Sequence, residues 1–301
     1  MRVLMPIDGS AYSKAALAFI ASRSTLIKSQ PDIELLNVQY PVSSRVARAA
    51  GRELIQFHHA SEAGKVIKSA LATLKRAGLQ ARSKSVVGNP GVEVSRVAAE
   101  DGADLIVMGS HGHTGFKSLL FGSVTQAVLA SCNTPLLALR SDVVPKKDSL
   151  KLGIALDGSK YGLAAVRFVA KHRELFGAAP LVTLIHVAPD LMNLVVPGFF
   201  GDSPVPGFKP EQVAEMQRAA FERAMAPAQK LLDAAGLQCT LSQLTGNQPG
   251  DVIAAYAMKR KLDVLVLGSR GIGGPGSALF GSVATRVASK CRNALLFIQE
   301  S

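Results

Sequence analysis

An internal duplication is the feature of this 301-residue sequence that most constrains its fold. Short motifs in the first half return in the same order in the second half. The pairs are Asp8–Ser10 with Asp157–Ser159, Glu34–Val38 with Thr183–Val187, Ala77–Gln80 with Ala235–Gln238, Asp104–Ser110 with Asp263–Ser269, and Leu120–Val124 with Leu279–Val283. Self-similarity of this kind means that one folding unit is present twice. We therefore predict two domains, 1–143 and 149–301, joined by a polar linker that contains Pro145.

Each copy alternates short runs of Val, Ile and Leu with longer stretches of helical period. In the first copy we expect strands near 2–7, 33–39, 81–87, 104–108 and 136–140, and helices near 11–28, 56–77, 91–101 and 123–132. Strand runs that are apolar throughout indicate a parallel sheet covered on both faces. Strand–helix alternation favours right-handed crossovers. The predicted fold is α/β, with two tandem doubly wound domains, each a five-stranded parallel sheet. If strands one to three wind one way and strands four and five the other, the strand order is 3-2-1-4-5.

A glycine-rich loop of fixed spacing follows the fourth strand of each copy. Both loops read Gly, two residues, Gly, nine residues, Gly-Ser. The matching positions are Gly109, Gly112, Gly122 and Ser123 in the first copy, and Gly268, Gly271, Gly281 and Ser282 in the second. Glycine at a strand exit lets the backbone approach a ligand or adopt a positive φ. The final Gly-Ser opens a helix whose N–H groups favour a phosphate, although a plain turn with a serine N-cap is the alternative.

An aspartate stands where the first strand of each copy passes into the first helix. Asp8 and Asp157 each begin an Asp-Gly-Ser sequence, which is also typical of a helix cap. In a doubly wound sheet a ligand binds outside the carboxyl ends of the strands, where the strand order reverses. Strands one and four would be neighbours there. We therefore expect Asp8 to face the loop that starts at Gly109 and to accept hydrogen bonds from a ribose or an adenine.

Composition excludes several classes of function. The net charge of +12 is spread evenly over both halves and is compatible with an anionic ligand. Three cysteines without a CxxC spacing give neither a disulfide framework nor a zinc site. No apolar run reaches the roughly 20 residues that a membrane span needs, and no export signal is visible, so we expect a cytoplasmic protein without a membrane partner. Few aromatic residues and no recognisable motif argue against nucleic-acid binding.

These features resemble the universal stress protein family in its two-domain tandem form. The resemblance covers nearly the whole chain and depends most on the doubled glycine-rich loop. It implies an adenine-nucleotide site in each half, usually with ATP and a divalent metal such as Mg²⁺. We assign no catalytic residue and no dedicated metal site to the protein itself, although the serine hydroxyl of each loop could contact phosphate or a bound Mg²⁺. Carried over by position, the nucleotide-binding residues are Asp8, Val38, Gly109, Gly112, Gly122, Ser123 and Val124, and Asp157, Val187, Gly268, Gly271, Gly281, Ser282 and Val283.

The resemblance also bears on assembly. The last strands, Leu136–Leu139 and Leu295–Ile298, are apolar, and in the family such edges join domains. We expect the two halves to pack as an internal dimer about a pseudo-two-fold axis. Whether the whole chain also forms a homodimer is left open by the sequence. The chain departs from the family in the insertion Asn193–Pro210, rich in Pro and Phe, which we expect to cover or obstruct the second site.

Three functions remain open from the sequence. The leading one is a cytoplasmic stress-response protein that binds ATP and uses occupancy as a signal. The second is an enzyme of the same fold, either a slow ATPase or a protein that phosphorylates itself at Ser123 or Ser282. The third is an interaction module in which the nucleotide is structural. The loops contain no Asp, no Glu and no Walker lysine, so we do not expect efficient catalysis.

Overall fold

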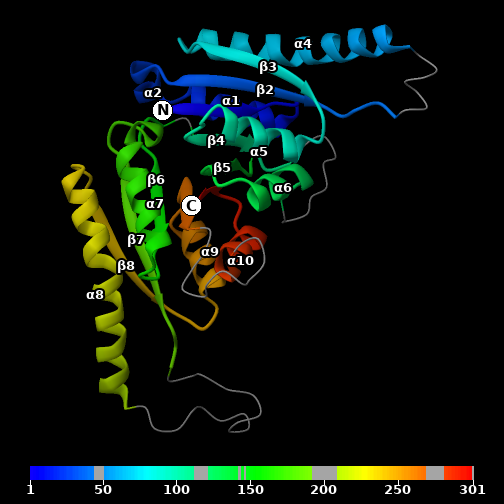
Figure 1. Cartoon of the computed structure of the whole chain (residues 1–301). Helices are drawn as coiled ribbons and strands as arrows, with labels where there is room; N and C mark the ends of the chain where they lie inside the picture. The colour runs from blue at the N-terminus through cyan, green and yellow to red at the C-terminus, as the bar shows by residue number, and fades with distance from the viewer. Residues whose placement is uncertain are drawn as a thin grey trace.

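The computed structural model describes residues 1–43, 51–111, 121–141, 144–145, 147–191, 209–268 and 281–299 (Figure 1). The described strands form one ten-stranded sheet in the order β3-β2-β1-β4-β5-β10-β9-β6-β7-β8. The first half contributes β1 (Arg2–Pro6), β2 (Asp32–Gln39), β3 (Ala81–Val87), β4 (Leu105–Gly109) and β5 (Leu136–Leu139). The second contributes β6 (Lys151–Ala155), β7 (Leu181–Ala188), β8 (Cys239–Thr245), β9 (Val264–Gly268) and β10 (Ala294–Ile298).

Each half is a doubly wound parallel sheet, as predicted. Within either half every strand pairs in parallel with its neighbours, and the order in chain sequence is 3-2-1-4-5. The run of Val, Ile and Leu in β4 is buried on both faces of the sheet, which explains why it shows no alternation of polar and apolar residues. The predicted α/β fold class is confirmed. The boundaries at 143 and 149 stay predictions.

Helices cover both faces of the sheet and form two apolar layers. One layer packs under α1 (Ala11–Ala21), α4 (Arg52–Arg76), α7 (Lys160–Lys171) and α8 (Pro210–Ala234). The other packs under α5 (Pro90–Glu100), α6 (Ser123–Ser131), α9 (Pro249–Lys259) and α10 (Ser282–Lys290). Each buried cluster contains residues of both halves, because the sheet between the layers is continuous.

The largest departure from the sequence prediction concerns the first helix. The stretch expected at 11–28 is divided into α1 and a short α2 (Ser24–Ser29). Ser22 is the C-cap of α1, and its hydroxyl donates to the carbonyl of Phe19 at 2.8 Å. Arg23 is extended, with φ −94° and ψ 98°, and its side chain is fully buried. In the second half the short helix Arg173–Phe176 has 3₁₀ geometry.

The two halves meet through their last strands. β5 and β10 pair antiparallel, with Leu136 opposite Phe297 and Ala138 opposite Leu295. These side chains are buried, and Phe297 packs edge-on against Phe121 of the first half with ring centroids 5.6 Å apart. Because the edges are apolar and paired, neither strand exposes its backbone to other chains. The expected junction between the last strands is therefore present.

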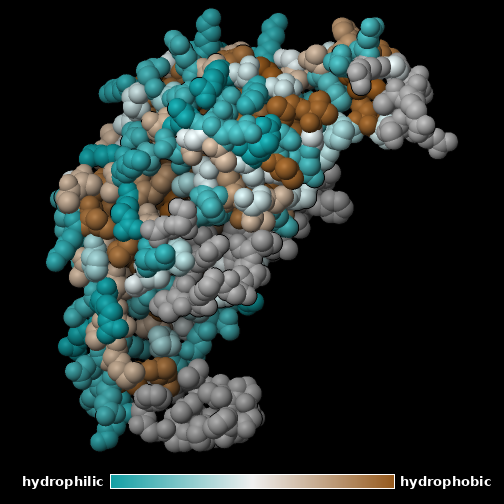
Figure 2. Space-filling model, viewed as in Figure 1, coloured by the Kyte–Doolittle hydropathy of each residue, from teal (hydrophilic) through white to brown (hydrophobic). Residues whose placement is uncertain are grey.

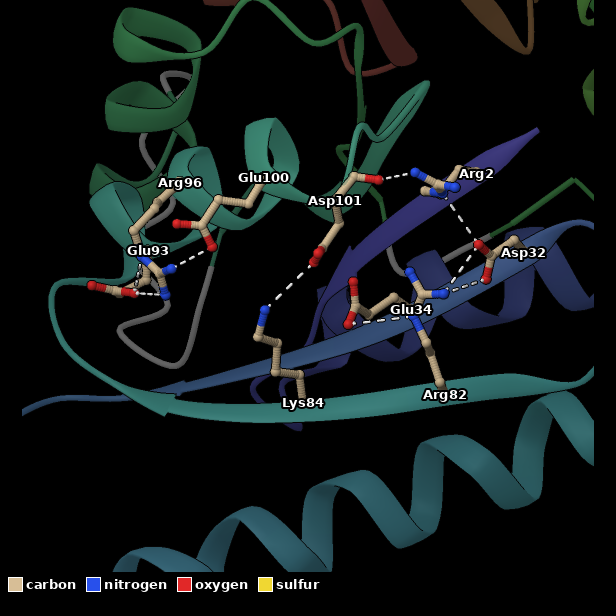
Figure 3. A network of polar contacts seen from close by, with 9 residues as sticks. All are labelled: Arg2, Asp32, Glu34, Arg82, Lys84, Glu93, Arg96, Glu100 and Asp101. Atoms are coloured by element: carbon tan, nitrogen blue, oxygen red, sulfur yellow. Dashed lines mark hydrogen bonds and ion pairs between the residues drawn. The ribbon is translucent and has the colours of Figure 1, made fainter.

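A network of charged side chains lies at the amino ends of the strands of the first half (Figure 3). Asp32 on β2 pairs with Arg2 at 3.2 Å and with Arg82 at 3.1 Å. Arg82 also lies 3.5 Å from Glu34, where burial raises the pKa of the carboxyl group and the neighbouring Asp101 adds to the rise. The network lies at the sheet edge opposite the expected ligand site. We therefore regard it as structural.

The second half replaces the Arg82–Glu34 pair of this network with neutral side chains. Thr183, at the position of Glu34, shares a 3.1 Å hydrogen bond with Thr240 on the neighbouring strand. The outer surfaces of α4 and α8 are largely hydrophilic (Figure 2). Among the described residues, no helix is both long and apolar enough to span a bilayer.

The junction can be tested by removing its aromatic contact. We expect Phe297→Ala to lower the free energy of unfolding by about 3–5 kcal/mol, because it opens a cavity between the two halves. Leu181→Ala is the control, since Leu181 is 61% exposed and should change stability by less than about 0.5 kcal/mol. Urea denaturation measures both variants. Equal effects of the two substitutions would contradict the packing at the junction.

Candidate functional site

The strand order brings the two sequence-predicted loops of each half to one edge of the sheet. β1 lies beside β4, with Val3 opposite Leu105, and β6 lies beside β9, with Leu152 opposite Val264. Both pairs are parallel, so the segments that follow them leave from the same carboxyl edge. This is the point at which the strand order reverses, where doubly wound sheets bind ligands.

The loop after β1 presents a carboxylate at this edge. Gly9 has a φ of +82°, a left-handed conformation that glycine adopts without strain. Asp8 accepts the N–H of Ser10 at 2.9 Å, and Ser10 accepts the N–H of Ser13 at 3.2 Å. The helix cap is therefore Ser10, and the Asp8 side chain is exposed.

The second half repeats this loop. Gly158 has a φ of +83°, Asp157 accepts the N–H of Ser159 at 2.9 Å, and Ser159 caps α7 through Gly162. The Asp157 side chain is also exposed. Each half thus holds one aspartate in the same turn, with one carboxylate oxygen engaged locally.

The glycine that ends β4 is required for a reason other than the one expected. Its φ is not positive, and a Cβ atom on Gly109 would lie 2.5 Å from Cβ of Tyr12 and 2.6 Å from the Tyr12 carbonyl carbon. Gly268 has the same relation to Tyr161, at 3.0 Å. The strand exit is therefore packed directly on the first turn of the first helix. The expectation that Gly109 is needed for a positive φ is wrong. Glycine is required there because Tyr12 leaves no room for a side chain.

The helices that follow the glycine-rich loops begin at glycine. Gly122 is the N-cap of α6, with φ −62° and ψ 159°, and Gly281 is the N-cap of α10. Ser123 and Ser282 are the first helical residues and are exposed, so the serine N-cap considered from the sequence is wrong. Glycine has no side chain to accept the first-turn N–H groups, and such helix ends bind anions.

The remaining predicted residues lie near these elements or outside the described part of the chain. Val38 is half-buried near the end of β2, and Val187 occupies the same place on β7. Val124 and Val283 are half-buried in the first turns of α6 and α10. Gly112, Gly271 and the insertion as far as 208 fall outside the described residues. Within the described part of the chain, no group of three His, Cys, Asp or Glu side chains could hold a metal ion.

A buried polar residue beside each aspartate loop was missed by the sequence analysis. Asn37 on β2 is 2% exposed and donates to the carbonyl of Ile7 at 2.8 Å. His186 on β7 has the same position in the second half, and its Nδ1 lies 2.9 Å from the carbonyl of Leu156. A carbonyl only accepts, so Nδ1 carries the proton. The sequence held a signal for these two residues, because each is a polar residue at the same position of an otherwise apolar repeated motif.

Polar contacts around the two sites differ. In the first half the Thr125 hydroxyl donates to the carbonyl of Gly109 at 3.3 Å, and Ala284 stands at the corresponding position of the second half. On α10, Arg286 instead forms two hydrogen bonds to Asp251, at 2.6 and 2.9 Å. These bonds hold the pKa of Asp251 well below its usual range. The two hydrogen bonds join α9 to α10 and are at full strength while Asp251 is ionised. They weaken only when the pH falls through the lowered pKa of Asp251.

The profile of the universal stress protein family matches residues 1–140 and 150–299 of this chain. The chain belongs to the universal stress protein family. A universal stress protein from Methanocaldococcus jannaschii is 29% identical to it, over 46% of this chain and 94% of that protein. One from Mycolicibacterium smegmatis is 25% identical over 99% of this chain and 96% of that protein. Family members therefore match either one half or the whole tandem chain.

Solved structures agree with the fold. The crystal structure of a universal stress protein from Archaeoglobus fulgidus aligns with all of this chain and 98% of that one, with a TM-score of 0.69. The two sequences are 20% identical, so this likeness bears on the fold alone. The whole tandem arrangement is thus shared by another member of the universal stress protein family.

The buried bond to the aspartate loop can be tested by substitution. We expect Asn37→Leu to lower the free energy of unfolding by about 1–3 kcal/mol, because the carbonyl of Ile7 is left without its donor. Asn37→His, which installs the residue of the second half, should retain most of the stability. Chemical denaturation of the three proteins measures the differences. If both variants lose the same stability, the hydrogen bond is not what holds the loop.

Proposed function

We propose that this universal stress protein binds ATP at the carboxyl edge of each half of its sheet and that nucleotide occupancy acts as a regulatory signal in a stress response. The observation that carries the proposal is the pairing of two features in each half. A glycine-capped helix opens at the same sheet edge at which an aspartate carboxylate is exposed. The helix end suits phosphates, and the carboxylate suits the hydroxyl groups of a ribose.

The residues divide into two roles. Asp8 and Asp157 would accept hydrogen bonds from ribose or adenine, with Val38 and Val187 contributing backbone groups. The glycine-rich loops would surround the ribose and phosphates through Gly109, Gly112, Gly122, Ser123 and Val124, and through Gly268, Gly271, Gly281, Ser282 and Val283. Mg²⁺ would arrive with the nucleotide, held mainly by phosphate oxygens and water.

The alternative is an enzyme of the same fold. Ser123 and Ser282 are exposed at the helix ends, where a bound γ-phosphate would lie nearby, so slow ATP hydrolysis or self-phosphorylation at these residues is the second proposal. The absence of Asp and Glu from both loop sequences favours binding over catalysis, since no carboxylate of the loop is available as a general base. We also propose a cytoplasmic location, an internal dimer of the two halves and no nucleic-acid partner.

Calorimetric titration with ATP and Mg²⁺ tests the binding sites. We expect close to two sites per chain, with Gly122→Val removing the first and Gly281→Val the second, because a branched side chain crowds the helix end that receives the phosphates. The affinity of the altered site should fall at least tenfold.

Gly64→Val is the matched control for this titration. Gly64 lies on α4, and a Cβ atom there would have no neighbour within 4 Å, so the same chemical change should leave both sites intact. Unchanged affinity in both loop variants would refute the assignment of the loops. Following radiolabelled ATP then separates the two functions, since label on the protein or released phosphate indicates an enzyme.

A further inference from the structure

The two outermost strands of the sheet, β3 and β8, occupy equivalent places in the duplication and share one pattern of burial (Figure 1). Within the described part of the chain, β3 pairs only with β2, and β8 pairs only with β7. An unpaired strand edge is a template on which another chain can pair. Proteins protect such edges with charged side chains, lysine above all, or with proline.

β3 carries this protection and β8 does not. Arg82 and Lys84 stand in β3 and form ion pairs with carboxylates at 3.1 and 3.5 Å. The corresponding residues of β8 are Thr240 and Ser242, and β8 as a whole contains no charged residue and no proline. Its Leu241 side chain is 40% exposed. The free edge of β8 is therefore open to pairing.

The pairing of β8 with β7 shows which backbone groups lie on the free edge. The N–H of Gly246, just after β8, donates to the carbonyl of Ala188 on β7 at 3.0 Å. Backbone groups of successive residues in a strand point alternately to its two sides. The odd-numbered residues of β8, from 239 to 245, therefore direct their N–H and C=O groups away from β7. Leu241 and Gln243 lie in the middle of this row.

These groups suit an antiparallel pairing of two copies of β8. With Ser242 of one copy opposite Ser242 of the other, Leu241 lies opposite Gln243, and the two residues can exchange backbone hydrogen bonds. The pairing uses the whole strand, because its two ends then lie opposite each other. No like charges meet, since β8 is uncharged. The equivalent pairing of β3 would set the two Lys84 side chains directly opposite each other, which is destabilising.

We propose that two copies of this protein pair antiparallel through β8 and form a dimer in which one sheet is continuous through both copies. The occupant of the edge is a second copy because β8 is complementary to itself about a two-fold axis, and a two-fold dimer uses the same surface on both subunits. The molecule already joins its own halves by antiparallel pairing of β5 with β10. The dimer is independent of nucleotide binding, because β8 contains none of the residues assigned to ATP.

Analytical ultracentrifugation of the full-length protein, at micromolar to millimolar concentrations, tests the dimer. We expect a reversible equilibrium between monomer and dimer. Gln243→Pro should weaken dimerisation at least tenfold, because proline removes an N–H that points away from β7 and leaves the bonds between β7 and β8 intact. Ser85→Pro is the matched control, since it makes the same kind of change at the corresponding position of β3. It should leave the dissociation constant unchanged.

Ser242→Lys is a second variant of the edge, which gives β8 the residue that β3 has at this position. It should also prevent the dimer, because two ammonium groups would face each other across the axis. A protein that stays monomeric at millimolar concentration would overturn the proposal. A dimer that Gln243→Pro and Ser85→Pro affect equally, or not at all, would overturn it as well.

Oxidative cross-linking tests the register of the pairing. In Ser242→Cys the two introduced thiols would face each other at a Cα separation of about 4.5 Å, within reach of a disulfide. We expect covalent dimers of this variant under mild oxidation. In the control Thr240→Cys the two thiols would be displaced by four residues, about 13 Å along the strands, and should not join. Equal yields from both variants would contradict the proposed register.

Discussion

The backbone pairing of β5 with β10 is the interaction on which the rest of the molecule depends. It converts two half-sheets into one continuous sheet, so both helical layers share apolar clusters that run through the two halves. Because the pairing is antiparallel, the halves are related by a pseudo-two-fold axis rather than by translation. The linker between the halves contacts both of them, since Arg23 of the first half donates to the carbonyl of Pro145 and Asp263 of the second half pairs with Lys147.

The two halves share the same backbone features but differ in their polar contacts. Both halves retain the aspartate turn, the tyrosine packed on the strand exit and the glycine cap. The donor to the aspartate loop is Asn37 in one half and His186 in the other. The Arg82–Glu34 pair of Figure 3 is replaced by a pair of threonines. Backbone geometry is thus common to both sites, whereas the surrounding charge is not. The two proposed sites therefore share their backbone frame and differ in the polar side chains around it.

The sequence predicts what local pattern and repetition determine. Apolar runs and their spacing predict the strands and the parallel sheet, and the apolar character of β5 and β10 predicts the junction. Side-chain contacts between distant segments could not be predicted. The break at Ser22 accompanies the burial of Arg23 against Pro145, and the need for glycine at Gly109 arises from Tyr12. The role of Asn37 could not be predicted, because its partner is the carbonyl of Ile7, which follows β1 and is 30 residues away in the sequence.

The central claim is that each half of this universal stress protein binds an adenine nucleotide. Native mass spectrometry of the intact protein, after incubation with ATP and Mg²⁺ and removal of the excess, measures this directly. The account predicts species that carry one and two nucleotides per chain, with the doubly loaded species growing as the ATP concentration rises. A spectrum that shows only the unliganded chain at millimolar ATP would contradict it.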